Sequence, residues 1–222
     1  MPPEIQLRTS KKDPWSIYKS LDEALILHCE NVAAYTEILY RLAMEEDIYP
    51  AGLSKRYLIH VRNAVIYHDI GKSLIPGSIL DKRGALTSDE RAYIKKHVPY
   101  GLAIFQKTME SRLASEDSII FLDMVIQSIA HHHERFDGNG YPGGLKGEEI
   151  SIIGRMCSLC DFYDALTSSR PYRQALSHEE VLVMIDWEKG RMFQPELVEL
   201  FMRHHEKFRK HRNHPKEQGR RI

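Results

Sequence analysis

The stretch His68-Asp69-Ile70-Gly71-Lys72 places an imidazole next to a carboxylate and ends in a lysine. A carboxylate has two oxygens, so Asp69 can bridge a pair of metal ions while His68 binds one of them. Further residues of the same kinds are spread along the chain: His28, His97, the run His131-His132-His133, and Asp161 within an apolar segment. A carboxylate in such a segment is seldom buried without a metal or ion-pair partner. Together these residues predict a metal centre between several helices.

Helical periodicity of apolar residues dominates the chain, and no segment shows the alternation of a strand. Gly71 is a helix stop, Thr87 and Ser177 begin capping boxes, and Pro195 suits a first helical turn. Helices are expected over about 15–46 (one long helix or a bent pair), 54–71, 87–109, 115–133 and 151–168, and from Ser177 and Pro195 onward. The prediction is an all-α bundle of about seven helices.

The composition is that of a globular domain: 222 residues, 42% hydrophobic and 28% charged, with zero formal net charge. We expect one domain over residues 15–202, an N-terminal extension (1–14) and a basic C-terminal segment (203–222). We interpret that segment as a solvated, fraying helix end rather than a surface for nucleic acid or an anionic partner. Neither a membrane span nor a signal peptide is evident, so we expect a cytoplasmic protein that binds neither membranes nor nucleic acid polymers.

Cys157 and Cys160 form a Cys-x-x-Cys pattern, but they lie in an apolar helical segment without a second pair. Two buried thiols are therefore expected rather than a zinc or redox site. The remaining histidines are expected to have ordinary structural or surface roles: His60, His131, His178, His204, His205, His211 and His214.

The candidate ligands divide into two groups. His28, His68, Asp69 and Asp161 can supply one ion, and His97 with two of the three consecutive histidines can supply a second, with Asp69 between them. Tandem histidines are best explained at a helix end, since neighbouring helix residues point about 100° apart. Composition alone leaves open which two of the three bind. Two ions about 3.5–4 Å apart would hold a hydroxide and stabilise an in-line phosphoryl displacement. Mixed imidazole and carboxylate ligands suit iron, manganese, zinc or nickel.

Positive side chains near these ligands are candidates for binding a substrate phosphate. Lys72 follows Asp69 by about one turn, and Arg170 and Arg173 follow Asp161. The alternative for the two arginines is that they are exposed basic residues after a helix. Asp164, one turn after Asp161, is either exposed or orients a ligand.

These residues resemble the HD-GYP family of bacterial cyclic dinucleotide phosphodiesterases over roughly residues 20–202. The motifs that carry the resemblance are His68-Asp69-Ile70-Gly71-Lys72, Ile75-Pro76, Ile79-Leu80-Asp81-Lys82-Arg83-Gly84, Glu90, His97 and Gly101, His132-His133-Glu134-Arg135-Phe136-Asp137-Gly138-Asn139-Gly140-Tyr141-Pro142, Asp161-Phe162-Tyr163-Asp164-Ala165-Leu166-Thr167 and Arg170-Pro171-Tyr172-Arg173.

The resemblance implies an HD-type helical bundle with metal ligands at His28, His68, Asp69, His97, His132, His133 and Asp161. It selects His132 and His133 from the triple histidine, because the family's pair directly precedes the glutamate. Lys72, Arg170 and Arg173 match phosphate-contacting positions. The Gly140-Tyr141-Pro142 loop matches one linked to contacts with diguanylate cyclase (GGDEF-type) domains. Some members bind a third metal through a glutamate where this chain has Ala24, so two divalent ions are expected, with iron or manganese favoured over nickel or zinc.

The expected function is hydrolysis of cyclic di-GMP to linear pGpG, to GMP, or to both, with Asp69 and Lys72 as catalytic residues. One alternative is a hydrolase of another cyclic dinucleotide, such as cyclic GMP-AMP. The alternative from a different class is a weakly active or inactive adaptor that binds diguanylate cyclase domains.

Overall fold

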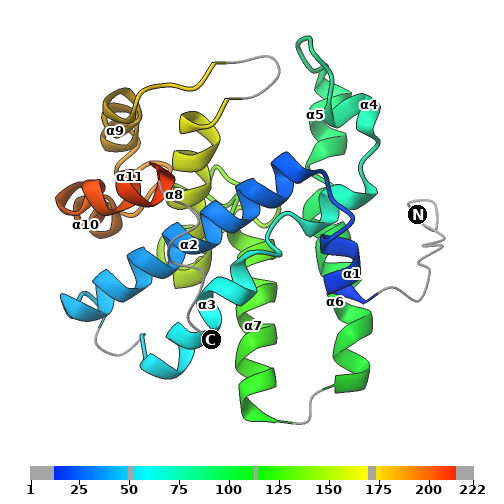
Figure 1. Ribbon diagram of the computed structural model, residues 1–222, viewed down its shortest axis with the longest axis horizontal. Coiled ribbons are helices and arrows are strands. Elements are labelled where there is room, and N and C mark those ends of the chain that lie inside the picture. Colours follow the sequence, from blue (N-terminus) through cyan, green and yellow to red (C-terminus); the bar gives the residue numbers. More distant parts are fainter. Residues whose placement is uncertain (1–12, 50–52, 113–114, 170–173, 214–222) are drawn as a thin grey trace.

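The computed structural model describes residues 13–49, 53–112, 115–169 and 174–213, and all regular elements within these ranges are helical (Figure 1). The all-α prediction is therefore confirmed. None of the described helices is both long and apolar enough to span a bilayer. The elements are α1 (Pro14–Tyr18), α2 (Glu23–Glu45), α3 (Lys55–Val65), η1 (a 3-10 helix, Ile70–Leu74), α4 (Gly77–Leu80), α5 (Ser88–Ile94), α6 (His97–Arg112), α7 (Glu116–His131), η2 (3-10, Gly147–Glu149), α8 (Ile152–Thr167), α9 (His178–Trp187), α10 (Pro195–Arg203) and α11 (His205–Asn213).

The structure has more helices than the seven expected, because several expected segments are interrupted. The first is a bent pair: the side chain of Asp22 accepts a hydrogen bond from the backbone nitrogen of Ala24 at 2.8 Å, which begins α2 as a new helix. The segment that begins at the Thr87 capping box ends at Ile94, and α6 starts three residues later at His97. The capping boxes at Thr87 and Ser177 are confirmed.

The long helix α2 crosses the middle of the molecule (Figure 1) and packs against α3, α8, α10 and α11. A second group forms around α7, which packs against α3, α6 and α8. Fully buried residues such as Tyr35, Leu39, Met124 and Leu159 fill the space between these helices. Helices that are far apart in sequence thus present side chains to one interior region.

Gly71 does not end a helix, as the sequence suggested. α3 already stops at Val65, and Gly71 lies inside η1. A Cβ atom at this position would overlap the carbonyl oxygen of His97 and lie 2.6 Å from the backbone nitrogen of Gly101. Glycine therefore allows η1 to lie directly against α6, which brings Asp69 close to His97.

The interpretation of the basic C-terminal segment as a solvated helix end is wrong for its first part. α11 packs on α2, and Phe208 is fully buried against Phe201 and Tyr35. Phe208 is the one apolar residue of this helix, and it completes the core between α2 and α10. Residues 214–222 lie outside the described part of the chain. The buried-thiol prediction is confirmed, since Cys157 and Cys160 are free and buried in α8.

Candidate metal centre

His68 and Asp69 lie in the turn that connects α3 with η1, and not within a regular helix. Their side chains are 0% and 1% exposed. In an α-helix two neighbouring side chains point about 100° apart, so both would rarely face one site. The turn removes that restriction. The same holds for His132 and His133, because His132 caps the C-terminus of α7 and His133 follows the helix.

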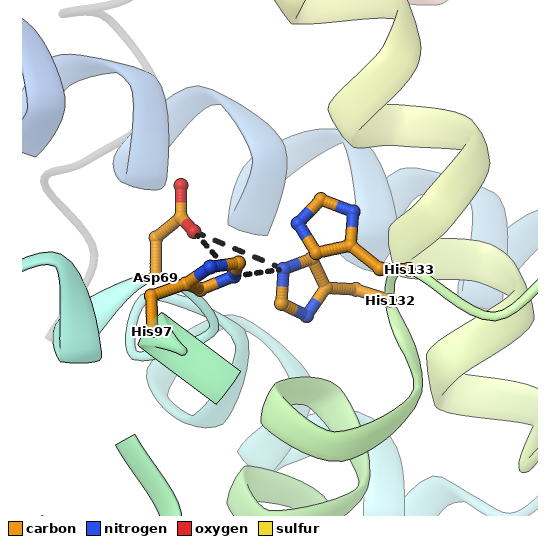
Figure 2. Close-up of side chains that lie close together, drawn as sticks. All are labelled: Asp69, His97, His132 and His133. Atoms are coloured by element: carbon orange, nitrogen blue, oxygen red, sulfur yellow. Dashed lines mark hydrogen bonds and ion pairs between the residues drawn. The ribbon is translucent and has the colours of Figure 1, made fainter. Parts of the chain in front are cut away.

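The two carboxylate oxygens of Asp69 face different groups of histidines. Oδ1 lies 3.4 Å from Nε2 of His97 and 3.8 Å from Nε2 of His132. Oδ2 lies 3.6 Å from Nε2 of His68 and 3.7 Å from Nε2 of His28. Figure 2 shows the first group, in which His133 joins Asp69, His97 and His132. In each group the candidate ligand atoms lie within 4.8 Å of one another, as one bound ion would require.

Backbone carbonyls fix the orientation of three of these histidines. Nδ1 of His68 lies 3.0 Å from the Val65 carbonyl, that of His97 lies 2.8 Å from the Ile94 carbonyl, and that of His132 lies 2.8 Å from the Ser128 carbonyl. A carbonyl oxygen can only accept, so each Nδ1 carries the proton and each Nε2 presents a lone pair to Asp69. This arrangement of the far nitrogen is the usual one for metal-binding histidines.

His28 is oriented by a carboxylate instead. Its Nδ1 lies 2.7 Å from Oδ2 of Asp164, whose other oxygen accepts a hydrogen bond from Asn31 at 2.9 Å. Its Nε2 lies 3.0 Å from Oδ1 of Asp161. Asp161 on α8 thus contacts His28, although the group of His28, His68 and Asp69 does not itself include it. Asp164 is buried and orients His28, so the sequence alternative of an exposed residue is wrong.

The buried atoms of the centre that have no hydrogen-bond partner within the described ranges include Nε2 of His68 and Oδ1 of Asp69. Buried polar atoms without partners cost about 1–3 kcal/mol each, so proteins keep them where a ligand satisfies them. Imidazole nitrogens and carboxylate oxygens are the donor types that first-row transition metals prefer. The residues therefore fit a metal ion at this place.

Protonation states favour metal binding at three of the histidines around Asp69, namely His68, His97 and His132. Burial lowers the pKa of His97 and His68, and burial together with His133 holds the pKa of His132 well below its usual range. Burial raises the pKa of Asp69, but Lys72 and the histidines outweigh this and keep it well below normal. Neutral imidazole and ionised carboxylate are the forms that bind metals.

His28 behaves differently from the other histidines of the centre. Burial lowers its pKa, but hydrogen bonds with Asp161 and Asp164 outweigh the burial and raise the pKa to about 9. His28 must therefore give up a proton before it can act as a ligand, so its side of the centre binds an ion in competition with that proton.

A buried glutamate, Glu134, holds the loop after α7 in place beside the centre. Glu134 is 2% exposed, and its carboxylate accepts hydrogen bonds from the backbone nitrogens of Gly143 at 2.6 Å and Leu145 at 3.0 Å. This folds the loop back, so that the ring of Tyr141 stacks on His133 with centroids 4.6 Å apart and planes 23° apart. The amine of Lys95 covers the Tyr141 ring, 4.6 Å from its centroid. Tyr141 therefore supports His133, while Pro142 remains exposed.

Of the predicted phosphate-binding residues, the structure places Lys72. Its amine forms an ion pair with Oδ2 of Asp69 and is only partly exposed. Arg170 and Arg173 lie outside the described residues. Sequence reasoning left the support of His133 by Glu134 and Tyr141 unassigned. The only sign of this role in the sequence is that Glu134 directly follows the three consecutive histidines.

Known proteins share this fold and sequence pattern. A model of the HD domain family matches residues 21–197. The chain is similar to 3'3'-cGAMP-specific phosphodiesterase 2 of Vibrio cholerae, with 36% identity over 181 residues, 82% of this chain and 31% of that protein. It is also 36% identical over 152 residues to the cyclic di-GMP phosphodiesterase response regulator RpfG of Xanthomonas campestris, covering 68% of this chain and 38% of that protein.

The chain thus spans about a third of the length of these relatives. A solved structure titled as a cyclic GMP-AMP specific phosphodiesterase from V. cholerae matches with a TM-score of 0.53 and 20% identity, over 82% of this chain and 45% of that one. At this identity the match concerns the fold alone, and it agrees with the helical architecture described above.

Proposed function

The chain belongs to the HD domain family, and we propose that it is a metal-dependent phosphodiesterase that hydrolyses cyclic di-GMP to linear pGpG, to GMP, or to both. The observation that carries this proposal is Asp69, whose two oxygens each face a separate group of buried histidines. Relatives whose names state cyclic di-GMP as substrate support the choice of substrate.

We propose two divalent ions, iron or manganese, with Asp69 as the shared ligand. His97, His132 and His133 would hold one ion, and His28, His68 and Asp161 the other. The arrangement supports this division, because the two groups of histidines face different oxygens of the Asp69 carboxylate. Position 24 is alanine, so a glutamate that could contribute to a third ion is missing one turn before His28.

Ions bound there would polarise a phosphoryl oxygen and lower the pKa of a water molecule, which is the chemistry that such centres supply. The protein's own residues then have distinct tasks. Asp69 is kept ionised and fixed by the Lys72 amine. Lys72 also carries positive charge at the edge of the centre, where it would offset the charge of a substrate phosphate. The backbone carbonyls that contact Nδ1 of His68, His97 and His132 keep the Nε2 lone pairs directed toward the ion sites.

A second substrate, 3'3'-cGAMP, is favoured by a specific observation: a relative named for that nucleotide matches 82% of this chain at 36% identity. Both nucleotides contain a guanosine phosphate unit, so one site can serve both. A role in binding a diguanylate cyclase domain would fall to the exposed tip of the loop at Pro142, since Tyr141 is turned inward onto His133.

The test combines metal analysis with turnover. Protein purified with manganese or iron should contain two ions per chain and hydrolyse cyclic di-GMP. The variant Asp69→Asn should lose both properties, whereas Asp123→Asn, an exposed change on α7, should keep them. Absence of hydrolysis in wild-type protein that holds two ions would refute the proposed function.

A further inference from the structure

A cavity of about 460 Å³ lies beside the metal centre. It is bounded by the N-terminal part of α2, by α4 and the segment that leads to α5, and by the C-terminal end of α8, all of which lie in the upper part of Figure 1. His28 and Lys72 line its inner side. Its volume is within the range of roughly 300–1,000 Å³ that is typical of small-molecule sites. A substrate whose phosphate meets Lys72 would therefore extend into this space.

The walls of the cavity suit a flat, largely apolar group. They are formed by half-buried aliphatic side chains from three elements and a loop: Leu25, Ile79, Leu80, Leu86 and Ile94. Ala24 adds a short side chain at the same place, which leaves room that a longer residue would fill. An ion pair between Lys82 and Glu90, at 2.6 Å, joins the loop after α4 to α5 and holds this wall together.

Most charged groups that line the cavity are already engaged. Lys72 is paired with Asp69, Lys82 with Glu90, and Asp164 with both His28 and Asn31. Asp22 caps α2. The carboxylate of Asp81 is different, because no hydrogen bond or ion pair involves it in the parts of the chain that the structure describes. The cavity therefore combines apolar walls with one carboxylate that is free to accept hydrogen bonds.

We propose that this cavity binds a guanine base of the substrate, and that Asp81 accepts hydrogen bonds from the N1–H and N2–H₂ groups of that base. This inference rests on the proposed function. The relatives' two substrates, cyclic di-GMP and 3'3'-cGAMP, share a guanine. Adenine presents an acceptor at N1, so a carboxylate would face a lone pair instead of a donor. A bidentate pair of this kind contributes strongly to discrimination between bases.

The direct test is equilibrium binding of GMP and of AMP to manganese-loaded protein by calorimetry. Wild-type protein should prefer GMP, and Asp81→Asn should lower the GMP-to-AMP affinity ratio by about tenfold or more, because the phosphate contacts are common to both. Asp89→Asn, an exposed aspartate on α5 outside the cavity, is the matched control and should keep the wild-type ratio. An unchanged ratio in Asp81→Asn, or an equal loss for both nucleotides, would overturn the assignment.

A second variant tests the place of binding. Ala24→Phe would fill the cavity and should weaken GMP by at least tenfold while the metal content stays at the wild-type value. Unchanged GMP binding in this variant would contradict the assignment.

Hydrolysis of cyclic di-GMP is measured on the same samples. If the protein hydrolyses cyclic di-GMP but Asp81→Asn does not change the preference for GMP, the guanine site is refuted and the proposed function stands. A base preference that depends on Asp81 without any turnover refutes the proposed function alone.

Discussion

Among the described residues, histidines and carboxylates that could surround an ion gather in two places: around Asp69, which belongs to two such groups, and at His178, His205 and Glu206. In the second cluster both ring nitrogens of His178 and Nδ1 of His205 have neighbours within hydrogen-bond distance. Nδ1 of His178 lies 2.9 Å from the Tyr163 hydroxyl, and its Nε2 lies 2.9 Å from Nδ1 of His205. Around Asp69, buried atoms of His68 and of Asp69 itself are left without partners. The distances between side chains are similar in the two clusters, but unpartnered buried polar atoms distinguish the cluster around Asp69 from the other.

The two clusters also differ in solvent exposure. His68, Asp69, His97 and His132 are at most 1% exposed, while Glu206 is exposed and also contacts Arg209. An exposed carboxylate that already has a cation beside it gains little from a metal ion. We therefore assign metal binding to the first cluster and a structural role to the second.

The largest expected effect follows from Asp69→Asn. It removes the shared charged ligand, so we expect loss of bound metal and a fall in kcat of on the order of 1,000-fold, because a metal centre supplies several kcal/mol. Elemental analysis and a nucleotide hydrolysis assay measure the two effects. The matching change in the second cluster, Glu206→Gln, should alter neither. Metal loss in Glu206→Gln would break the comparison.

Asp164→Asn should have a smaller effect, since Asp164 orients His28 without belonging to either ligand group. We expect metal affinity to fall by about 10- to 100-fold, the usual cost of losing such a partner. Competition with a metal-sensitive dye measures the affinity. Asn31→Ala removes only the other partner of Asp164 and should cost less; an equal loss in both variants would mean that Asp164 acts through the general fold.

Glu134→Gln tests the support of His133. The carboxylate accepts two backbone hydrogen bonds, and an amide would turn an N–H group toward one of those donors, so we expect a loss of about 1–3 kcal/mol in the free energy of unfolding. Urea denaturation measures it, with the exposed Glu148→Gln as control. Since His133 depends on the same loop, metal content should fall as well. Full stability in Glu134→Gln would show that the loop does not need this anchor.

The smallest effect is expected from Tyr163→Phe, which removes a hydrogen bond from the second cluster. The free energy of unfolding should fall by about 1 kcal/mol, and the metal content should remain unchanged. Urea denaturation and elemental analysis check both statements, with Tyr57→Phe at a more exposed position as reference. A loss of metal in Tyr163→Phe would indicate that the two clusters are coupled.

Helical periodicity in the sequence predicts the all-α fold, and the candidate ligands that it indicates do meet: His28, His68, Asp69, His97, Asp161 and two of the three consecutive histidines. The choice of His132 and His133 among those three depends on the family resemblance. The sequence did not predict where the helices break. The sequence pattern favours a helix stop at Gly71, whereas in the structure this glycine allows the close approach of η1 to α6, a contact that periodicity cannot show. The inward stacking of Tyr141 on His133 likewise depends on how Glu134 folds the loop.

The burial of Phe208 in the C-terminal segment could not be predicted either, because the residues around it are mostly charged. A single apolar residue among charged ones gives little periodicity, so its contact with α2 became visible only in three dimensions. For His178 and His205, the sequence assignment to structural roles agrees with their mutual hydrogen bond.

The most direct test of the comparison is an anomalous-diffraction map from crystals of the protein grown with manganese. We expect two peaks, one on each side of the Asp69 carboxylate, and none between His178 and His205. A peak between His178 and His205, or the absence of any peak beside Asp69, would contradict the account.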